Sequence, residues 1–177
     1  MHLPLVPHSS CLPQPPFKLW ANVDHAASFG AMGTTNIWFG IEAPAGRFVL
    51  PDAAEPVRTD GLWQTTCFEA FLRRPGATAY REWNFAPSSQ WAAYDFTGYR
   101  EGMTDAGEPS PPYIRMEDNL TWWTLGATIA VEADGVWEMG LSAVIEERSG
   151  ARSYWALAHP PGAPDFHHRD CFAGRLA

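Results

Sequence analysis

The stretch Thr66-Cys-Phe-Glu-Ala-Phe-Leu-Arg73 is followed by Arg74-Pro-Gly-Ala-Thr78 and then by Tyr80-Arg-Glu-Trp-Asn-Phe-Ala86. Both flanking runs are rich in aromatic residues, and the segment between them contains the Pro-Gly pair that is typical of a turn. This pattern predicts two antiparallel strands joined as a hairpin.

The same pattern of short β-type runs closed by Gly and Pro extends along the whole chain. In the run Phe17–Asp24, Phe17, Leu19, Ala21 and Val23 fall on one face, and Asp134-Gly135 between two later runs indicates another hairpin. We expect further strands at Thr34–Glu42, Arg47–Leu50, Trp91–Phe96, Tyr113–Glu117, Thr121–Val131, Val136–Ile145, Tyr154–His159 and Cys171–Leu176, with a surface loop over residues 98–112. The sequence therefore predicts one all-β domain over residues 1–177, a two-sheet antiparallel β-sandwich with little helix.

Composition and charge exclude several classes of function. The net charge is −8 and a single Lys stands beside eleven Arg, so no basic surface for a nucleic acid is expected. No stretch approaches the length of an apolar membrane span, and the N-terminus has no signal-peptide pattern. The odd count of cysteines (Cys11, Cys67 and Cys171) indicates free thiols, and we expect a cytoplasmic protein.

The hairpin also contains the strongest candidate site. A turn at residues 74–78 would place Glu69 opposite Asn84 and Phe71 opposite Glu82, and directly opposed residues share a face. The next hairpin would place Asp95 opposite Glu82. Acidic side chains among large rings are costly to bury unless they are hydrogen-bonded, and a ligand-binding face is one way to satisfy them. The alternative is that Glu69 and Glu82 pair with Arg73, Arg81 or backbone groups at a strand edge.

Aromatic side chains close to these polar groups suggest a sugar ligand. Sugar rings present C–H faces that stack on Trp or Tyr, while carboxylates and amides bind their hydroxyls. The candidates are Trp63, Trp91, Tyr94, Trp122 and Trp123, and each could instead belong to the core. Trp122 and Trp123 are neighbours on one strand, so one of the two is expected to face outward.

A second group of polar residues lies in a proline-rich segment near the C-terminus. His159, Asp165, His167 and His168 are candidates for a metal site, for a ligand-contacting loop or for a hydrogen-bonded structural loop, and their spacing matches no zinc signature. We expect the loop from His159 to Asp170 to lie against the Glu69/Glu82 hairpin without forming a closed metal site.

Catalytic motifs are sparse. The sequence has no Gly-x-Ser-x-Gly elbow and no HExxH pattern. Glu69 and Glu82 could serve as acid and base on a glycoside, and Cys67 with His159 is a formal nucleophile-base pair. We therefore assign no catalytic residue, no metal ligand and no required cofactor from the residues alone.

Several runs together resemble the bacterial DOMON-like proteins, which are similar to family-9 carbohydrate-binding modules. The runs are Leu-Trp-Gln-Thr-Thr-Cys-Phe-Glu-Ala-Phe (62–71), Tyr-Arg-Glu-Trp-Asn-Phe-Ala-Pro-Ser-Ser-Gln-Trp-Ala-Ala-Tyr (80–94), Tyr-Arg-Glu-Gly-Met (99–103), Tyr-Trp-Ala-Leu-Ala-His-Pro (154–160) and Pro-Asp-Phe-His-His (164–168). The resemblance extends from about Trp38 to the C-terminus and implies a ligand-binding β-sandwich.

Sugars and haem are the two ligand classes that this resemblance implies. We expect non-catalytic binding of a small polar ligand, most simply a sugar or a sugar-containing metabolite. An enzyme acting on such a metabolite and a haem-binding domain are the alternatives. The predicted ligand-binding residues are Trp63, Glu69, Glu82, Asn84, Trp91, Tyr94, His159, Asp165, His167 and His168.

Overall fold

The fold was analysed in a computed structural model, which describes residues 1–26, 32–108 and 110–177. Its helices are four short 3₁₀ turns: η1 (Ser9–Cys11), η2 (Ala45–Arg47), η3 (Leu62–Gln64) and η4 (Arg169–Cys171). Its strands are β1 (His2–Pro7), β2 (Leu19–Ala26), β3 (Met32–Ile41), β4 (Cys67–Arg73), β5 (Tyr80–Phe85), β6 (Trp91–Phe96), β7 (Thr104–Asp105), β8 (Tyr113–Asp118), β9 (Trp123–Glu132), β10 (Trp137–Glu146), β11 (Arg152–Ala156) and β12 (Gly174–Leu176).

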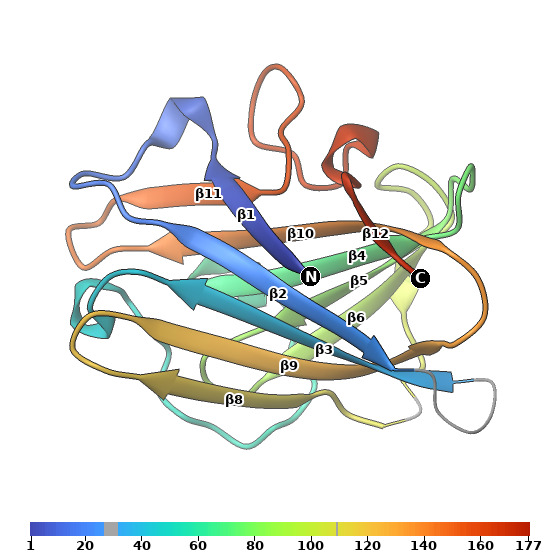
Figure 1. Cartoon of the computed structure of the whole chain (residues 1–177), viewed down its shortest axis with the longest axis horizontal. Coiled ribbons are helices and arrows are strands. Elements are labelled where there is room, and N and C mark those ends of the chain that lie inside the picture. Colours follow the sequence, from blue (N-terminus) through green and yellow to red (C-terminus); the bar gives the residue numbers. More distant parts are fainter. Residues whose placement is uncertain (27–31, 109) are drawn as a thin grey trace.

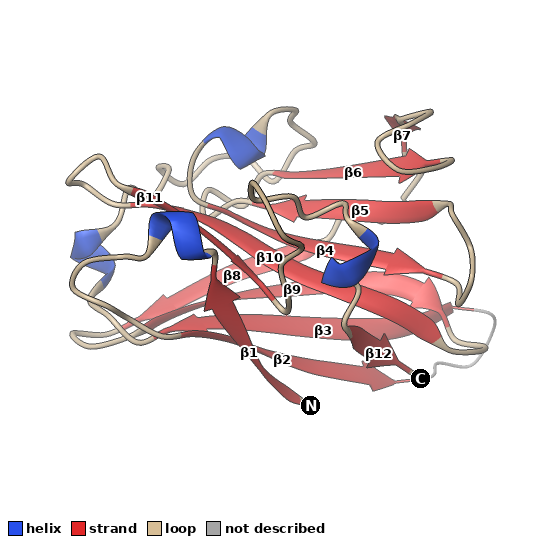
Figure 2. Ribbon diagram, turned by 90° about the horizontal axis from the view of Figure 1, so that it is seen from above, coloured by secondary structure: helices blue, strands red, loops and turns tan. Residues whose placement is uncertain are grey.

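The strands form two layers, which confirms the predicted all-β sandwich (Figure 1). We call the layer with order β8-β9-β3-β2 sheet A and the layer with order β7-β6-β5-β4-β10-β11 sheet B, with β12 added beside β10. The pairings between these strands are antiparallel. Seen from above, strands β6, β5 and β4 of sheet B lie in the upper part of the view and strands β3 and β2 of sheet A in the lower part (Figure 2).

Strand β1 connects the two layers along one edge. Its first part pairs with β2, where Leu3 faces Ala21 and Leu5 faces Leu19. Its last residues, Val6 and Pro7, pair instead with β11. The sandwich is therefore hydrogen-bonded across this edge.

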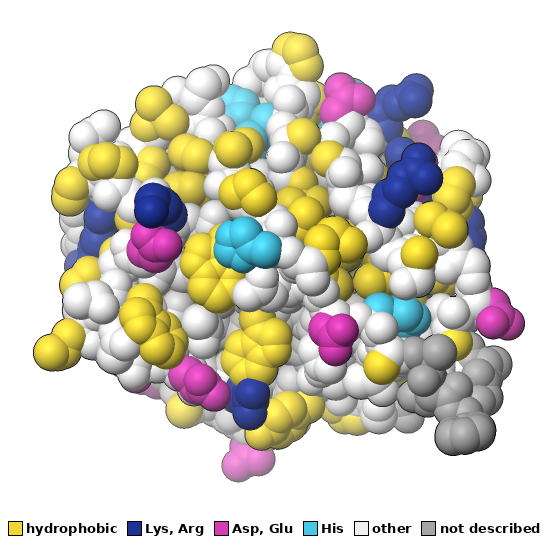
Figure 3. Space-filling model, viewed as in Figure 1, with side chains coloured by type: hydrophobic (Ala, Val, Ile, Leu, Met, Phe, Trp, Pro, Cys, Tyr) yellow, Lys and Arg dark blue, Asp and Glu magenta, His cyan; other side chains and the backbone are white. Residues whose placement is uncertain are grey.

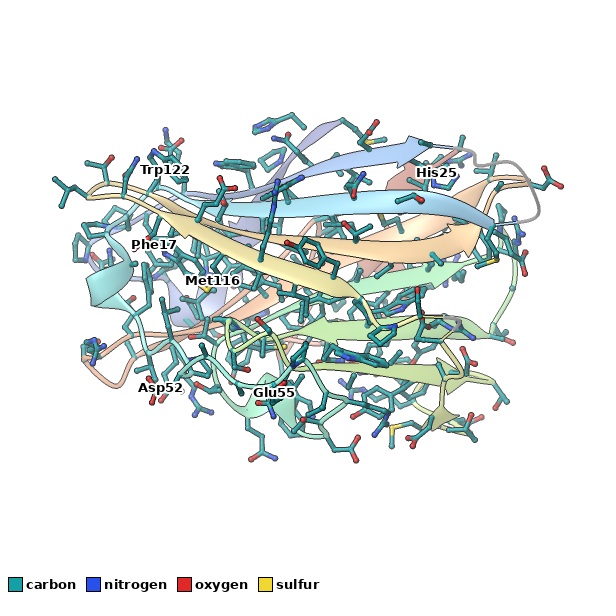
Figure 4. The ribbon with its side chains drawn as sticks, turned by 90° about the horizontal axis from the view of Figure 1, so that it is seen from below. Phe17, His25, Asp52, Glu55, Met116 and Trp122 are labelled. Atoms are coloured by element: carbon teal, nitrogen blue, oxygen red, sulfur yellow. The ribbon has the colours of Figure 1, made fainter. Side chains whose placement is uncertain are left out.

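The core lies between the sheets and is built by alternation along each strand. Sheet A contributes the predicted apolar series from β2 together with Phe39 from β3, while sheet B contributes Phe68 and Ala70 from β4. Phe39 and Phe68 meet across the layers with ring centroids 4.9 Å apart. Seen from the β8 edge, Met116 is directed between the layers and Trp122 lies at the end of β8 and β9 (Figure 4).

Several segment boundaries differ from the prediction. Residues 47–50 form no strand, because the chain there follows the η2 turn and makes only the single bridge Phe48 to Glu147. The segment predicted as Tyr154–His159 ends at Ala156, so His159 lies in a loop. The predicted final strand is preceded by η4 and begins only at Gly174. The two additional strands, β1 and β7, were not predicted; β1 contains two prolines, which weaken a strand pattern.

The paired tryptophans and the three cysteines lie as the sequence predicts. Trp123 is fully buried whereas Trp122 is 39% exposed, which confirms that the two neighbours face opposite ways. Cys11, Cys67 and Cys171 are unpaired thiols. Over the residues that the structure describes, no helix is long and apolar enough to cross a bilayer.

Candidate functional site

The predicted register of the first hairpin is confirmed. Glu69 faces Asn84 and Phe71 faces Glu82 across β4 and β5. Because β4 and β5 alternate, Cys67, Glu69 and Glu82 point away from the core and toward the outer face of sheet B. The carboxylates therefore share one surface.

The register of the second hairpin is shifted by one residue from the prediction. Glu82 faces Tyr94, and Asp95 faces Arg81. The cause is Ser89, which has a φ of 77° and lets a three-residue loop close between Ala86 and Gln90. This shift brings Tyr94, rather than Asp95, beside Glu82.

The outer face of sheet B is partly covered by loops and contains a cavity. A second hydrophobic cluster lies on it, in which Phe71, Tyr80, Tyr94, Phe96 and Phe172 are buried. Beside this cluster is a cavity of about 760 Å³. Its lining comprises Asp60, Gly61, Trp63, Glu69, Glu82, Tyr94, Phe96, Arg100, Met103, Asp105, Val144, Arg152, Tyr154, Pro164, Phe166 and His167.

Two buried carboxylates form the floor of the cavity. Glu69 is 4% exposed and Glu82 is 6% exposed. The Ser142 hydroxyl donates to Glu69 Oε2 at 2.9 Å, and the Asn84 amide donates to Glu82 Oε1 at 2.5 Å. Burial, with the nearby charge of Glu82, raises the pKa of Glu69 from 4.5 to about 8, and burial also raises the pKa of Glu82.

The rim combines rings with charged groups. Trp63 stands on η3 and is 55% exposed. The Tyr94 hydroxyl donates to Asp60 at 2.6 Å, and this hydrogen bond helps lower the pKa of Asp60. Arg58 lies 3.0 Å from Asp60 and 2.5 Å from Asp105, so it ties both rim carboxylates together.

His167 forms one wall and confirms that the predicted loop lies against the hairpin. Its Nδ1 is 2.7 Å from the Tyr80 hydroxyl, and its Nε2 is 3.7 Å from Glu82 Oε2, longer than a hydrogen bond. The Arg100 backbone N–H donates to the same Tyr80 oxygen, which leaves the hydroxyl hydrogen for His167 Nδ1. Burial and the charge of Arg100 lower the pKa of His167 to about 4, so the imidazole is neutral at pH 7.

Asp165 supports the cavity from behind. It accepts hydrogen bonds from the Tyr99 hydroxyl at 2.5 Å and from Arg100 Nη2 at 2.8 Å. Burial alone would raise its pKa, but these two bonds outweigh burial and lower it. Arg100 has a φ of 54°, so the chain turns sharply at the point where this guanidinium reaches the cavity.

Arg100 lies within the segment predicted as a surface loop, and we did not select it from the sequence. The signal was present, since Tyr-Arg-Glu-Gly-Met (99–103) is one of the runs that carry the family resemblance. The additional lining residues Asp60, Arg152 and Tyr154 come from separate segments, and no local pattern joins them.

Five predicted site residues do not line the cavity: Asp165, described above, and the four that follow. Trp91 is 7% exposed and belongs to the core. Asn84 is 1% exposed and supports Glu82 from below. His159 Nε2 contacts the Val6 carbonyl at 2.9 Å. His168 accepts from the Asp170 backbone and lines a separate hollow of about 540 Å³. Of the predicted set, the cavity is lined by Trp63, Glu69, Glu82, Tyr94 and His167.

The described residues form neither a metal site nor a nucleophile-base pair. Within residues 1–26, 32–108 and 110–177, no group of three or more His, Cys, Asp or Glu side chains is placed to hold a metal ion. The Cys67 thiol is fully buried and contacts Asn84 Oδ1 at 3.7 Å, and its pKa is raised by burial. His159 is engaged with Val6, so the two do not form a nucleophile-base pair.

Haem, the other ligand class implied by the resemblance, does not fit this cavity. The floor presents two buried carboxylates, whereas a porphyrin macrocycle needs apolar surface on both faces. Both nitrogens of His167 face protein groups, Tyr80 on one side and Glu82 on the other. Met103, the methionine at the rim, is 60% exposed.

Comparison with known proteins gives a likeness of fold. No protein-family profile matches the sequence, and no curated protein matches it. The crystal structure of a candidate carbohydrate-binding protein from Bacteroides uniformis superposes with a TM-score of 0.61 at 15% identity, covering 99% of this chain and 85% of the other. Family-9 carbohydrate-binding modules from Caldicellulosiruptor kristjanssonii, in complex with glucose and with cellotriose, superpose with TM-scores of 0.46 at 15% identity. They cover 82% of this chain and 69% and 68% of their own. The chain thus has the fold of the Bacteroides protein.

Proposed function

We propose that this protein binds a small sugar or sugar-containing metabolite in the cavity on sheet B, without catalysis. The observation that carries the proposal is one cavity in which hydrogen-bonding carboxylates form the floor and rings form the walls. A sugar needs acceptors for its hydroxyls and a flat apolar surface for its C–H face. The likeness to the Bacteroides protein supports the same ligand class.

The proposal extends to the family and the compartment. The runs at 62–71, 80–94 and 99–103 support assignment to the DOMON-like proteins, since most of the cavity's floor and part of its rim fall within them. Three unpaired cysteines are in keeping with a reducing cytoplasm.

The test is titration of the purified protein with glucose, cellotriose and galactose, monitored by calorimetry. Trp63→Ala should weaken binding about tenfold, the equivalent of about 1.4 kcal/mol, and should leave the melting temperature unchanged because the ring is half exposed. Trp122→Ala is the matched control, since this exposed ring does not line the cavity. Absence of binding to every sugar, or equal affinity of wild type and Trp63→Ala, would contradict the proposal.

One observation favours a second candidate function, acid-base catalysis on a sugar. Burial raises the pKa of Glu69 to about 8 and so keeps it protonated at neutral pH beside a second carboxyl, Glu82, and a protonated carboxyl held next to another is an arrangement that catalytic acids use. Turnover of any sugar that binds, abolished in Glu69→Gln while binding persists, would establish it. Binding with no product formed would exclude it for the sugars tested.

A further inference from the structure

The floor of the cavity has two carboxylate oxygens that no protein donor uses. Glu69 Oε1 and Glu82 Oε2 receive no hydrogen bond from the described residues, although both side chains are more than nine-tenths buried. Both residues line the cavity, so the free oxygens belong to its surface. Buried carboxylates are normally paired or fully hydrogen-bonded.

The cations around the site are already committed to other partners. Arg100 is paired with Asp165 at 2.8 Å, and Arg152 with Glu146 at 3.3 Å. Arg81, on the core side of β5, pairs with Asp95 at 2.7 Å. His167 faces Glu82 but is neutral at pH 7. Within the described part of the chain, no ammonium or guanidinium lies within 4 Å of Glu69 or Glu82.

The charge of Arg100 partly offsets the rise in the pKa of both carboxyls, but its guanidinium is paired with Asp165. A cation that contacts the two free oxygens would therefore come from outside the protein. Without a ligand this positive charge is a proton, since the pKa of Glu69 is about 8 and its carboxyl stays protonated at neutral pH. A ligand cation can take the place of that proton, and in a buried site this exchange is worth more than at the surface.

The walls favour an ammonium group over a metal ion. Rings of Tyr94, Phe96, Tyr154 and Phe166 line the cavity, and aromatic faces attract ammonium groups. An ammonium has three donors and can bridge two carboxylates, whereas a metal ion requires more ligands than these two side chains supply.

We propose that the Glu69/Glu82 floor is a subsite for a primary ammonium group, which makes an amino sugar the preferred ligand of the cavity. This inference rests on the proposed function and adds the ligand class. It predicts that binding expels the proton held by the pair.

The experiment compares glucosamine, glucose and N-acetylglucosamine by calorimetry at pH 7, in two buffers of different ionisation enthalpy. Glucosamine should bind at least about tenfold more tightly than the other two. Its apparent binding enthalpy should differ between the buffers because a proton is released, while that of glucose should not. N-acetylglucosamine is the matched ligand, since acetylation removes the charge and keeps the ring.

Two variants locate the effect. Glu69→Gln and Glu82→Gln, each tested separately, should reduce the glucosamine preference to within about twofold and abolish proton release. Glu117→Gln, an exposed carboxylate on β8 in sheet A, should leave the preference intact. Melting curves verify that each variant is folded, and the comparison of ligands on wild type does not depend on any variant.

The outcomes separate the two proposals. Glucose binding with no glucosamine preference would overturn the amino-sugar inference and leave sugar binding in place. Glucosamine preference that survives in both Gln variants would also overturn it. Failure of all three ligands to bind would count against the proposed function itself.

Discussion

The two sheets each have an outer face made by every second residue of their strands, but the two faces differ in what covers them. On sheet B, the segments around Arg100 and His167 bury two carboxylates and enclose a cavity. On sheet A, Trp20 lies against Gly40 and Trp38 against Gly126, where an added Cβ would meet the rings at 2.1 and 2.7 Å. Figure 3 shows hydrophobic side chains gathered across this face with scattered charges among them.

The comparison shows that tryptophan content alone does not identify a binding face. Trp38 is held between Gly126 and Arg115, whose guanidinium carbon is 4.2 Å from the ring centroid. Its aromatic surface is therefore already occupied. The adjacent groove of about 370 Å³ is lined by the exposed carboxylate of Asp24, whereas the carboxylates of the sheet B cavity are buried. What distinguishes the candidate site is the loop cover that buries charge.

The largest effect expected from this difference is on stability at high pH. The pKa of Glu69 is about 8 in the fold and 4.5 ordinarily, so as pH rises the unfolded chain loses its proton first. The contribution of Glu69 to the free energy of unfolding is complete below pH 4.5 and is lost between pH 4.5 and 8. The free energy of unfolding of the wild type should therefore fall by up to about 4 kcal/mol more than that of Glu69→Gln between pH 5 and pH 9.

Denaturant unfolding at the two pH values measures this effect. Asp24→Asn changes an exposed carboxylate on sheet A and should alter stability by less than about 0.5 kcal/mol at both. If Glu69→Gln and Asp24→Asn change the free energy of unfolding equally at both pH values, the outer faces of sheets A and B do not differ in buried charge.

A smaller effect is expected at low pH from His167. Its pKa is about 4 in the fold and 6.5 ordinarily, so as pH falls the unfolded chain binds a proton first. The contribution of neutral His167 to the free energy of unfolding is complete above pH 6.5 and is lost between pH 6.5 and 4. In His167→Asn the free energy of unfolding should fall by up to about 3 kcal/mol less than in the wild type over this range. The 16% exposure of the His167 side chain reduces the expected difference somewhat.

Unfolding free energies of wild type and His167→Asn across pH 4–7 test this. The ring proton signals of His167, followed by NMR, give the pKa directly. A titration midpoint near 6.5 would show that the wall of the cavity is open to water.

The smallest effect is on the sheet A side. Gly126→Ala places a methyl group against the rigid Trp38 ring and should destabilise the protein by about 1–2 kcal/mol. Sugar affinity should not change, because this contact lies on the opposite sheet from the cavity. Thermal unfolding and calorimetry on the same sample measure both quantities, and a loss of affinity in the folded variant would show that the faces are coupled.

The first hairpin was predictable because its turn at residues 74–78 is short and fixes which residues of the two strands face each other. Glu69 and Glu82 were therefore placed on one face from the sequence. The second hairpin was predicted one residue out of register, and this single step put Trp91 on the face of Glu82. In the structure Trp91 opposes Phe85 and joins the core.

The remainder of the site depends on long-range packing. Arg100, Asp60 and Tyr154 reach the cavity from different loops and strands, and nothing in their local sequence indicates that they meet. The histidine loop shows the same limit: His167 was correctly expected near the hairpin, while His159 and His168 turn to other partners. The alternation of residues along a strand predicts which side chains share a face of the sheet. The positions of the loops that cover that face depend instead on contacts between distant parts of the folded chain.

The connection made by β1 has a consequence for how fast the chain acquires this fold. Val6 and Pro7 pair with Trp155 and Ala156, so an early segment must wait for a late one before that edge of the sandwich can form. Pairings between distant segments carry a large loop-closure cost and slow the search for the native topology. We therefore expect refolding on a timescale of roughly milliseconds to seconds, and on the ribosome β1 would remain without its β11 partner until nearly the whole chain has been made.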